Sequence, residues 1–161
     1  MNEFQRRALD ILNQTDYISS VAKPGRTIVN IDYFAYTLRL GTDAVPVPLL
    51  TPTQGLMEMQ SDSDFVATFV SGGQQLTAGA PLSFNGPVLL QFVDTGSGKS
   101  WFNTPTLMPL VCGAGGFPFL LPSPRVLNPN TNLEITASII GPDTMVGIYV
   151  VLHGSRIFYA S

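Results

Sequence analysis

The alternation of apolar and polar residues predicts a chain built mainly from β-strands. Between residues 132 and 139 every second side chain is apolar, which is typical of a strand with one buried face. Segment 27–40 has the same period over a greater length, and we expect a bulge or break near Asp32 because few strands run so far without one. Residues 65–70 predict a shorter strand that ends at Gly72-Gly73.

Two further runs are apolar on both faces, residues 88–93 and 145–152. This pattern predicts central strands, or strands whose outer face is covered by a neighbour. Shorter strands are predicted at 55–60, 107–111, 117–121 and 156–159. We expect Pro122 to stop one of them and residues 153–155 to form a turn before the last. The predicted fold class is therefore all-β: an antiparallel jelly roll or β-sandwich of about eight strands, with a short N-terminal helix.

The N-terminal segment, residues 2–15, is the part of the chain with helical periodicity. We expect residues 1–23 to form a helical arm and residues 24–161 to form the β-sandwich domain. Two uses of the arm stay open: packing on its own sandwich, or docking onto another subunit. The candidate docking face consists of the apolar stripe and the arginine beside it: Phe4, Arg7, Ala8, Ile11 and Leu12.

Two proline-rich segments are candidate contact loops. Residues 45–52 contain three prolines, so they are expected to be coil or an edge strand. Residues 117–124 likewise place Phe and Leu beside prolines. Because proline lowers the entropy that a loop loses on binding, both segments are expected to offer rigid apolar contacts.

Composition supports association with other chains. Charged residues make up 12% of the chain, against about 25% in an average protein, and apolar residues make up 45%. A surface with so few charges is expected to be buried in part against other copies or other proteins. The net charge is −3 with no basic run, which argues against nucleic acid and anionic membranes as partners. No apolar run is long enough to span a bilayer, and we expect a soluble chain without a classical export signal.

The residues that usually bind metals are too few to predict a metal centre. Cys112 and His153 are the only Cys and His in the chain, so we expect no metal site and no cofactor. Cys112 is interpreted as a small buried hydrophobe, and His153 as a residue at a core edge or in a turn. Trp101 and Phe102 are expected to anchor the core or an interface.

One motif suggests an enzyme. Asp94-Thr95-Gly96 follows an apolar run and resembles the catalytic motif of retropepsin-like aspartic proteases, which are homodimers with one such aspartate in each chain. Residues 113–117 resemble the glycine-rich flap of that family, and residues 139–141 resemble its Ile-Ile-Gly element. The family continues that element with a helix, whereas this chain continues with Pro142 and an apolar strand. Asp-Thr-Gly is also a good hairpin turn, which we favour, and a homodimeric protease that uses Asp94 is the alternative.

A second motif, Gly96–Ser100, resembles half of a phosphate-binding loop. The full pattern requires glycine at position 93, which is valine here, and a helix after Ser100, where Pro105 prevents one. No nucleotide site is therefore expected.

Taken in order, residues 27–160 resemble the jelly-roll accessory proteins of tailed-phage virions. The resemblance lies in a string of short segments: 61–65, 89–94 with 98–99, 102–105, 113–116, 120–124, 128–129 and 152–158. It implies a non-enzymatic virion structural protein of the cement, decoration or collar type, which binds and stabilises a capsid or head–neck assembly. It further implies no catalytic residues, homo-oligomers, contacts with major capsid or neck proteins, and a place in the virion after assembly in the host cytoplasm.

Overall fold

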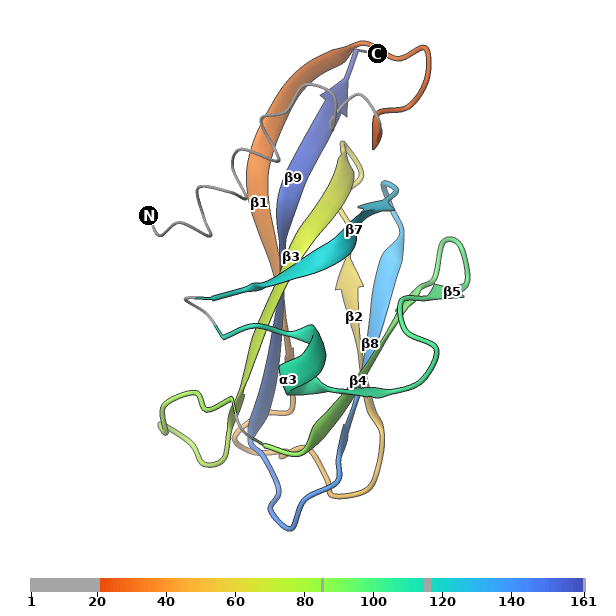
Figure 1. Ribbon diagram of the computed structural model, residues 1–161. Helices are drawn as coiled ribbons and strands as arrows, with labels where there is room; N and C mark the ends of the chain where they lie inside the picture. Colours follow the sequence, from red (N-terminus) through yellow and green to blue (C-terminus); the bar gives the residue numbers. More distant parts are fainter. Residues whose placement is uncertain (1–20, 85, 115–116, 161) are drawn as a thin grey trace.

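The computed structural model describes residues 21–84, 86–114 and 117–160. These residues form two antiparallel sheets that pack face to face (Figure 1). The first sheet has the order β1 (Ile28–Leu40), β9 (Gly147–Tyr159), β3 (Asp64–Gln75) and β7 (Phe119–Leu127). The second has the order β2 (Thr53–Glu58), β8 (Asn132–Ile139), β4 (Val88–Asp94) and β5 (Lys99–Ser100), with β6 (Thr106–Leu107) also paired to β4. The predicted all-β sandwich is confirmed.

The order of pairing is that of a jelly roll. Early strands pair with late ones in reverse order: β1 with β9, β2 with β8, β3 with β7 and β4 with β5. The chain thus resembles one long hairpin whose tip lies between β4 and β5, rolled so that its two halves contribute to both sheets. The predicted helix 2–15 and the predicted docking face Phe4, Arg7, Ala8, Ile11 and Leu12 lie outside the described residues.

β1 has nearly the predicted bounds, but its irregularity lies elsewhere. The register with β9 shifts between Ile28 and Asn30 and is unbroken from there to Leu40. Asp32 lies directly opposite Arg156 and forms an ion pair with it, with 3.6 Å between the charged atoms. This cross-strand pair favours regular pairing at the position where we predicted a break.

The predicted turn at residues 153–155 is wrong, because β9 runs through it without interruption. Gly154 lies opposite Ala67 of β3, just before a register shift between Ala67 and Phe69. A Cβ at position 154 would lie 2.8 Å from the carbonyl carbon of Val66 and still closer to its oxygen. Glycine is present here because the two backbones approach closely inside a sheet, and not because the chain turns.

The end predicted for β3 at Gly72-Gly73 is also wrong, since the strand continues to Gln75. A Cβ on Gly72 would lie 2.5 Å from Cε of Met108 and 2.8 Å from the carbonyl oxygen of Tyr149. The bare backbone at Gly72 therefore makes room for Met108, which is fully buried.

Met108 begins a one-turn helix, α3 (Met108–Val111), where the sequence pattern predicted a strand over 107–111. Pro109 lies in the first turn of α3, where its missing N–H has no partner to lose and its fixed φ suits a helix. Met108 and Val111 are buried, and the turn lies beside the core. The apolar run thus arises from a helical turn with two buried residues, which a run of five apolar residues cannot distinguish from a strand.

Pro122 does not stop β7, which contains both Pro122 and Pro124. β7 is the outermost strand of its sheet, and its register with β3 shifts between Ala67 and Phe69. Proline is tolerated in edge strands and bulges because no ladder hydrogen bond is required of it there.

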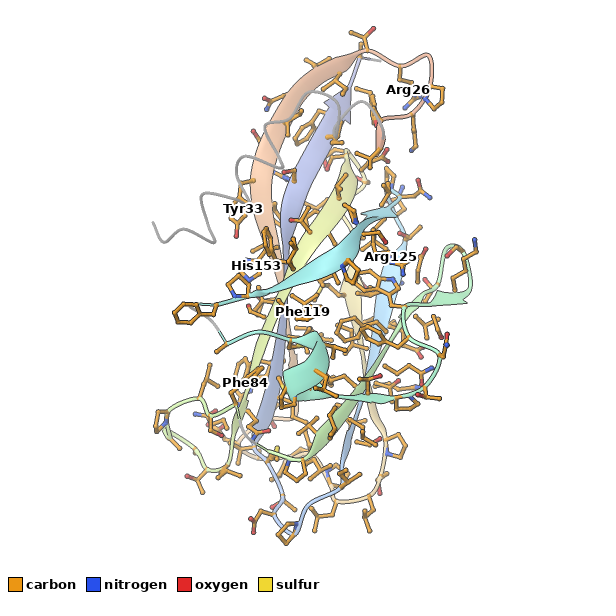
Figure 2. The ribbon with its side chains drawn as sticks, in the orientation of Figure 1. Arg26, Tyr33, Phe84, Phe119, Arg125 and His153 are labelled. Carbon is orange, nitrogen blue, oxygen red and sulfur yellow. The ribbon has the colours of Figure 1, made fainter. Side chains whose placement is uncertain are left out.

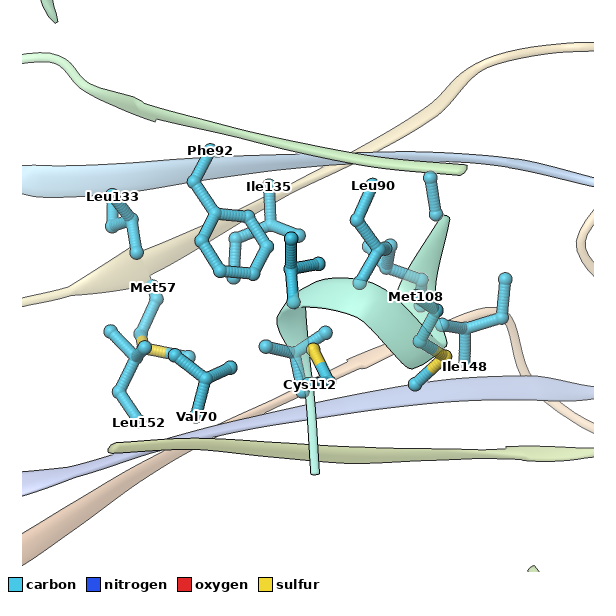
Figure 3. Close-up of a cluster of buried hydrophobic side chains, with 14 of the residues drawn as sticks. Met57, Val70, Leu90, Phe92, Met108, Cys112, Leu133, Ile135, Ile148 and Leu152 are labelled. Carbon is cyan, nitrogen blue, oxygen red and sulfur yellow. The ribbon is translucent and has the colours of Figure 1, made fainter. Parts of the chain in front are cut away.

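The core lies between the two sheets (Figure 3). Alternate residues of β8 are buried, which confirms the strand predicted from strict alternation. β4 buries Val88, Leu90 and Phe92 fully, while its other face is half-buried, so the prediction of two buried faces holds only in part. β9 lies between β1 and β3, which confirms its central position. Trp101 and Phe102 pack on Phe92 with ring centroids 5.5 and 5.4 Å away, as expected of core anchors.

Candidate interaction surface

An apolar surface of the described residues lies where α3 and the start of β7 meet. Leu110, Phe117 and Leu120 have exposed fractions of 63%, 72% and 38%. Phe117 and Leu120 line a hollow of about 520 Å³ together with Phe84, Pro109 and Phe119, and Leu110 follows Pro109 on α3. We call this region, Phe84, Leu110, Phe117, Phe119 and Leu120, the β7 surface. A surface of this kind is typical of a contact with another protein.

The backbone beneath the β7 surface is held firmly. The N–H of Gly113 donates to the carbonyl of Val70 at 3.0 Å, and the N–H of Gly72 donates to the carbonyl of Gly113 at 2.9 Å. The N–H of Phe117 donates to the carbonyl of Ala114 at 2.7 Å. A Cβ on Gly113 would lie 2.5 Å from the carbonyl carbon of Pro118, so glycine allows the chain to fold back on itself here. The exposed phenylalanine is therefore presented from an anchored backbone.

The outer edge of β7 completes this surface. β7 pairs with β3 on one side, and no strand among the described residues pairs with its other side. Pro122 and Pro124 lack an N–H and so limit what could be added there as a further strand. A partner is therefore expected to bind through side chains beside this edge and not as an added strand.

The other predicted contact loop, residues 45–52, is exposed only in part. Val45 and Leu50 have exposed fractions of 70% and 76%, but Val47 is fully buried. The N–H of Val47 donates to the carbonyl of Met145 at 2.7 Å, and the N–H of Leu50 donates to the carbonyl of Ile139 at 3.0 Å. The loop is thus coil fastened to β8 and to the segment before β9, as its prolines predicted, with Val45 and Leu50 left at the surface.

Asp94 lies in the hairpin turn that the sequence predicted. One carboxylate oxygen accepts from the N–H of Gly96 at 3.0 Å, and the other accepts from the hydroxyl of Ser97 at 2.6 Å. The N–H of Gly98, whose φ is +67°, donates to the carbonyl of Asp94 at 2.8 Å. Both carboxylate oxygens are therefore engaged by their own turn, which is the usual role of aspartate at this position.

Cys112 is buried beneath the hollow, as predicted. Its exposed fraction is 1%, and burial raises the pKa of the thiol to about 12. The thiol is therefore protonated at neutral pH and serves as core packing.

His153 lies in the middle of β9, and Figure 2 shows it beside Tyr33 of β1. Its Nδ1 is 2.7 Å from the hydroxyl of Tyr33 on β1, and its Nε2 is 2.7 Å from the hydroxyl of Ser71 on β3. Burial lowers the pKa of His153 and raises that of Tyr33, so both are neutral at pH 7. Sequence reasoning missed this chain of three polar groups because they come from three strands, and the single signal was a lone histidine within an apolar run.

The chain was also compared with known proteins. No protein-family model matches it, and no curated protein matches it in sequence. Function is therefore inferred from the fold and the surface.

Two further findings concern the described part of the chain. No group of three or more His, Cys, Asp or Glu side chains there is arranged to hold a metal ion. No helix in it has the length and apolar character needed to cross a membrane.

Proposed function

We propose that this chain is a non-enzymatic structural protein of a virion, which binds and stabilises a capsid or head–neck assembly alongside other copies of itself. The observation that carries the proposal is the β7 surface, where apolar side chains are exposed from an anchored edge of the sandwich. The resemblance to cement, decoration and collar proteins supplies the kind of assembly.

The jelly-roll fold supports the proposal, but proteins with other functions share this fold. Jelly rolls form viral capsid domains, but they also form lectins and cupins. Function must therefore be argued from the surface. In this chain the charged fraction of 12% accompanies an exposed apolar edge, which favours a protein partner over a soluble substrate.

The free energy available from burying the β7 surface is too small to hold a single partner, which favours binding to a repeated lattice. Completing the burial of Leu110, Phe117 and Leu120 from their present exposure is worth about 3–5 kcal/mol in all. Bringing two proteins together costs about 4–15 kcal/mol, so one such contact does not hold a stable pair. On a capsid, neighbouring copies contact the shell and each other at once, and the contacts reinforce one another through high local concentration.

A sedimentation experiment tests this proposal. Capsids of the virus that encodes the chain, purified without it, are mixed with the recombinant protein and pelleted. The wild-type protein should pellet with the capsids, and the double variant Leu110→Asp with Phe117→Asp should remain in the supernatant. Leu56→Asp is the matched control, because Leu56 is 51% exposed but lies on β2 of the other sheet. Failure of the wild-type protein to pellet, or equal loss in the control, would contradict the proposal.

The docking arm remains a prediction of the sequence. Deleting residues 1–20 should leave a folded sandwich that binds capsids less well if the arm docks onto a partner. If the arm packs on its own domain, the deletion should lower the melting temperature instead. A truncated protein with unchanged melting temperature and unchanged binding would exclude both uses.

The hydrogen bonds of Asp94 do not support the aspartic-protease alternative. The catalytic aspartates of that family share a proton across a dimer, whereas both oxygens of Asp94 accept hydrogen bonds from its own turn. Asp94→Asn tests this directly. A pepstatin-sensitive peptidase activity that the substitution abolishes would replace the structural proposal.

A further inference from the structure

The Tyr33–His153–Ser71 chain lies on the outer face of the first sheet, and none of its three residues belongs to the β7 surface. In the register of the sheet His153 lies opposite Phe69, and Ser71 lies two residues farther along the same strand. The two side chains are therefore diagonal neighbours on one face, which is within reach of a hydrogen bond. Their 2.7 Å separation is that of a nucleophile held against a general base.

The tautomer that makes His153 a base follows from its second partner. If Nδ1 carries the proton and donates to the phenol oxygen of Tyr33, Nε2 is free to accept the proton of Ser71. Burial lowers the pKa of His153, so the imidazole is neutral and able to accept that proton at pH 7. Tyr33 thus has the orienting position that a carboxylate holds in a catalytic triad, but without its negative charge.

Ser71 also borders a space that a substrate could enter. Its exposed fraction is only 4%, yet it lines a hollow of about 210 Å³ together with Leu82, Ser83, Phe84, Tyr149 and Val151. This hollow is smaller than the roughly 300–1,000 Å³ of sites for drug-sized ligands. Its walls are mainly apolar, which suits a short alkyl chain.

We propose that Ser71 is a nucleophilic modification site that accepts a short acyl group from an activated ester. The hydroxyl oxygen of Ser71 attacks the acyl carbon while its proton passes to Nε2 of His153. The bond between the acyl carbon and the leaving oxygen then breaks, and the leaving group departs with the bonding electron pair and takes the proton from Nε2. The products are an ester on Ser71 and a free alcohol or phenol, with neutral His153 restored.

The test uses p-nitrophenyl acetate as the acyl donor and the full chain as the acceptor. Release of nitrophenol is followed by absorbance, and peptide mass mapping locates the acetyl group. The folded wild-type protein should gain one acetyl group at Ser71. Ser71→Ala should abolish acetylation there, and Ser71→Cys should restore acylation at position 71. Ser97→Ala, which removes an exposed serine in the turn after β4, is the control and should change nothing.

Variants of His153 and Tyr33 distinguish a role in the acylation reaction from a purely structural role. His153→Gln should slow acetylation of Ser71 about 100-fold, as is typical when a general base is lost. The wild-type rate should rise through the lowered pKa of His153 and be level by neutral pH, and Tyr33→Phe should shift that profile because Tyr33 positions the imidazole. Circular dichroism of each variant establishes that it is folded. Absence of acetyl on Ser71 in the folded wild-type protein, or an unchanged rate in His153→Gln, would overturn the proposal.

Discussion

The close approach of β9 to β3 at Gly154 leads to a quantitative prediction. A Cβ added at position 154 would lie 2.8 Å from the carbonyl carbon of Val66 and 3.0 Å from Cα of Ala67, and closer still to the carbonyl oxygen of Val66. These are backbone atoms of a paired strand, so no side-chain rotation relieves the contact, and the strands must move apart. Overpacking of this kind together with weakened ladder hydrogen bonds is expected to cost Gly154→Ala about 3–5 kcal/mol. For a chain of this size the melting temperature would fall by roughly 6–20 °C.

The assay is urea unfolding followed by circular dichroism, with melting temperature as a second readout. Gly73→Ala is the matched control, because Gly73 also lies within a strand of the first sheet, but the nearest atoms to a Cβ there are Cβ of Leu82 at 3.3 Å and the carbonyl oxygen of Ser83 at 3.5 Å. The free energy of unfolding of Gly73→Ala should change by less than about 1 kcal/mol. Alanine loses less conformational entropy on folding than glycine does, and this offsets the slight contact. If Gly154→Ala is as stable as Gly73→Ala, residues 153–155 do not lie inside a continuous strand and our account of this contact is incorrect.

Three further predictions concern single side chains. Phe92→Ala removes a fully buried ring in contact with Trp101, so the free energy of unfolding should fall by about 3–5 kcal/mol in urea titrations, and a loss below about 1 kcal/mol would be inconsistent with this core. Cys112, buried and with its thiol pKa raised to about 12, should react with a disulfide reagent only on unfolding, and rapid reaction in the native protein would contradict its burial. The pKa of His153, which faces Tyr33 from β1 and Ser71 from β3, is lowered from 6.5 by burial, so its contribution to stability is present above pH 6.5 and declines as the pH falls from there through the native pKa. His153→Gln should flatten that decline, and an identical pH dependence in the variant would refute the assignment.

The local alternation of apolar and polar residues is sufficient to predict the strands that have one solvent-exposed face. β8 and β1 were found because a half-buried strand must alternate, and alternation survives in any context. It failed at Gly154, Gly72 and Pro122, where glycine or proline has a tertiary role. The pattern predicts a turn at residues 153–155 and a strand end at Gly72-Gly73, because glycine is common in turns and at strand ends as well as in close backbone contacts. Only the neighbouring strand distinguishes these cases. Pro122 is tolerated because β7 is an edge strand, a property that belongs to the sheet and not to the segment.

The sequence predicts part of the β7 surface but does not predict the Tyr33–His153–Ser71 chain. Residues 117–124 were expected to expose Phe beside proline, and Phe117 is indeed 72% exposed. The pattern does not predict the exposure of Leu110, because it predicts a strand over 107–111 where α3 forms. The hydrogen bonds of His153 depend on which strands flank β9, and strand order is a long-range property that local periodicity does not contain.

The position of β9 has a consequence for how the protein acquires its structure. β9 comes after all the other strands in sequence, yet it lies between β1 and β3, which come near the beginning. Until residues 147–159 have left the ribosome, the first sheet lacks its centre and the apolar inner faces of β1 and β3 have no strand between them. Pairing across such separations closes large loops, so folding is expected to be slow and to follow synthesis. A nascent chain of this protein therefore exposes aggregation-prone strands for most of its synthesis, and the yield of soluble protein should depend on chaperones and temperature more than the stability of the finished sandwich would suggest.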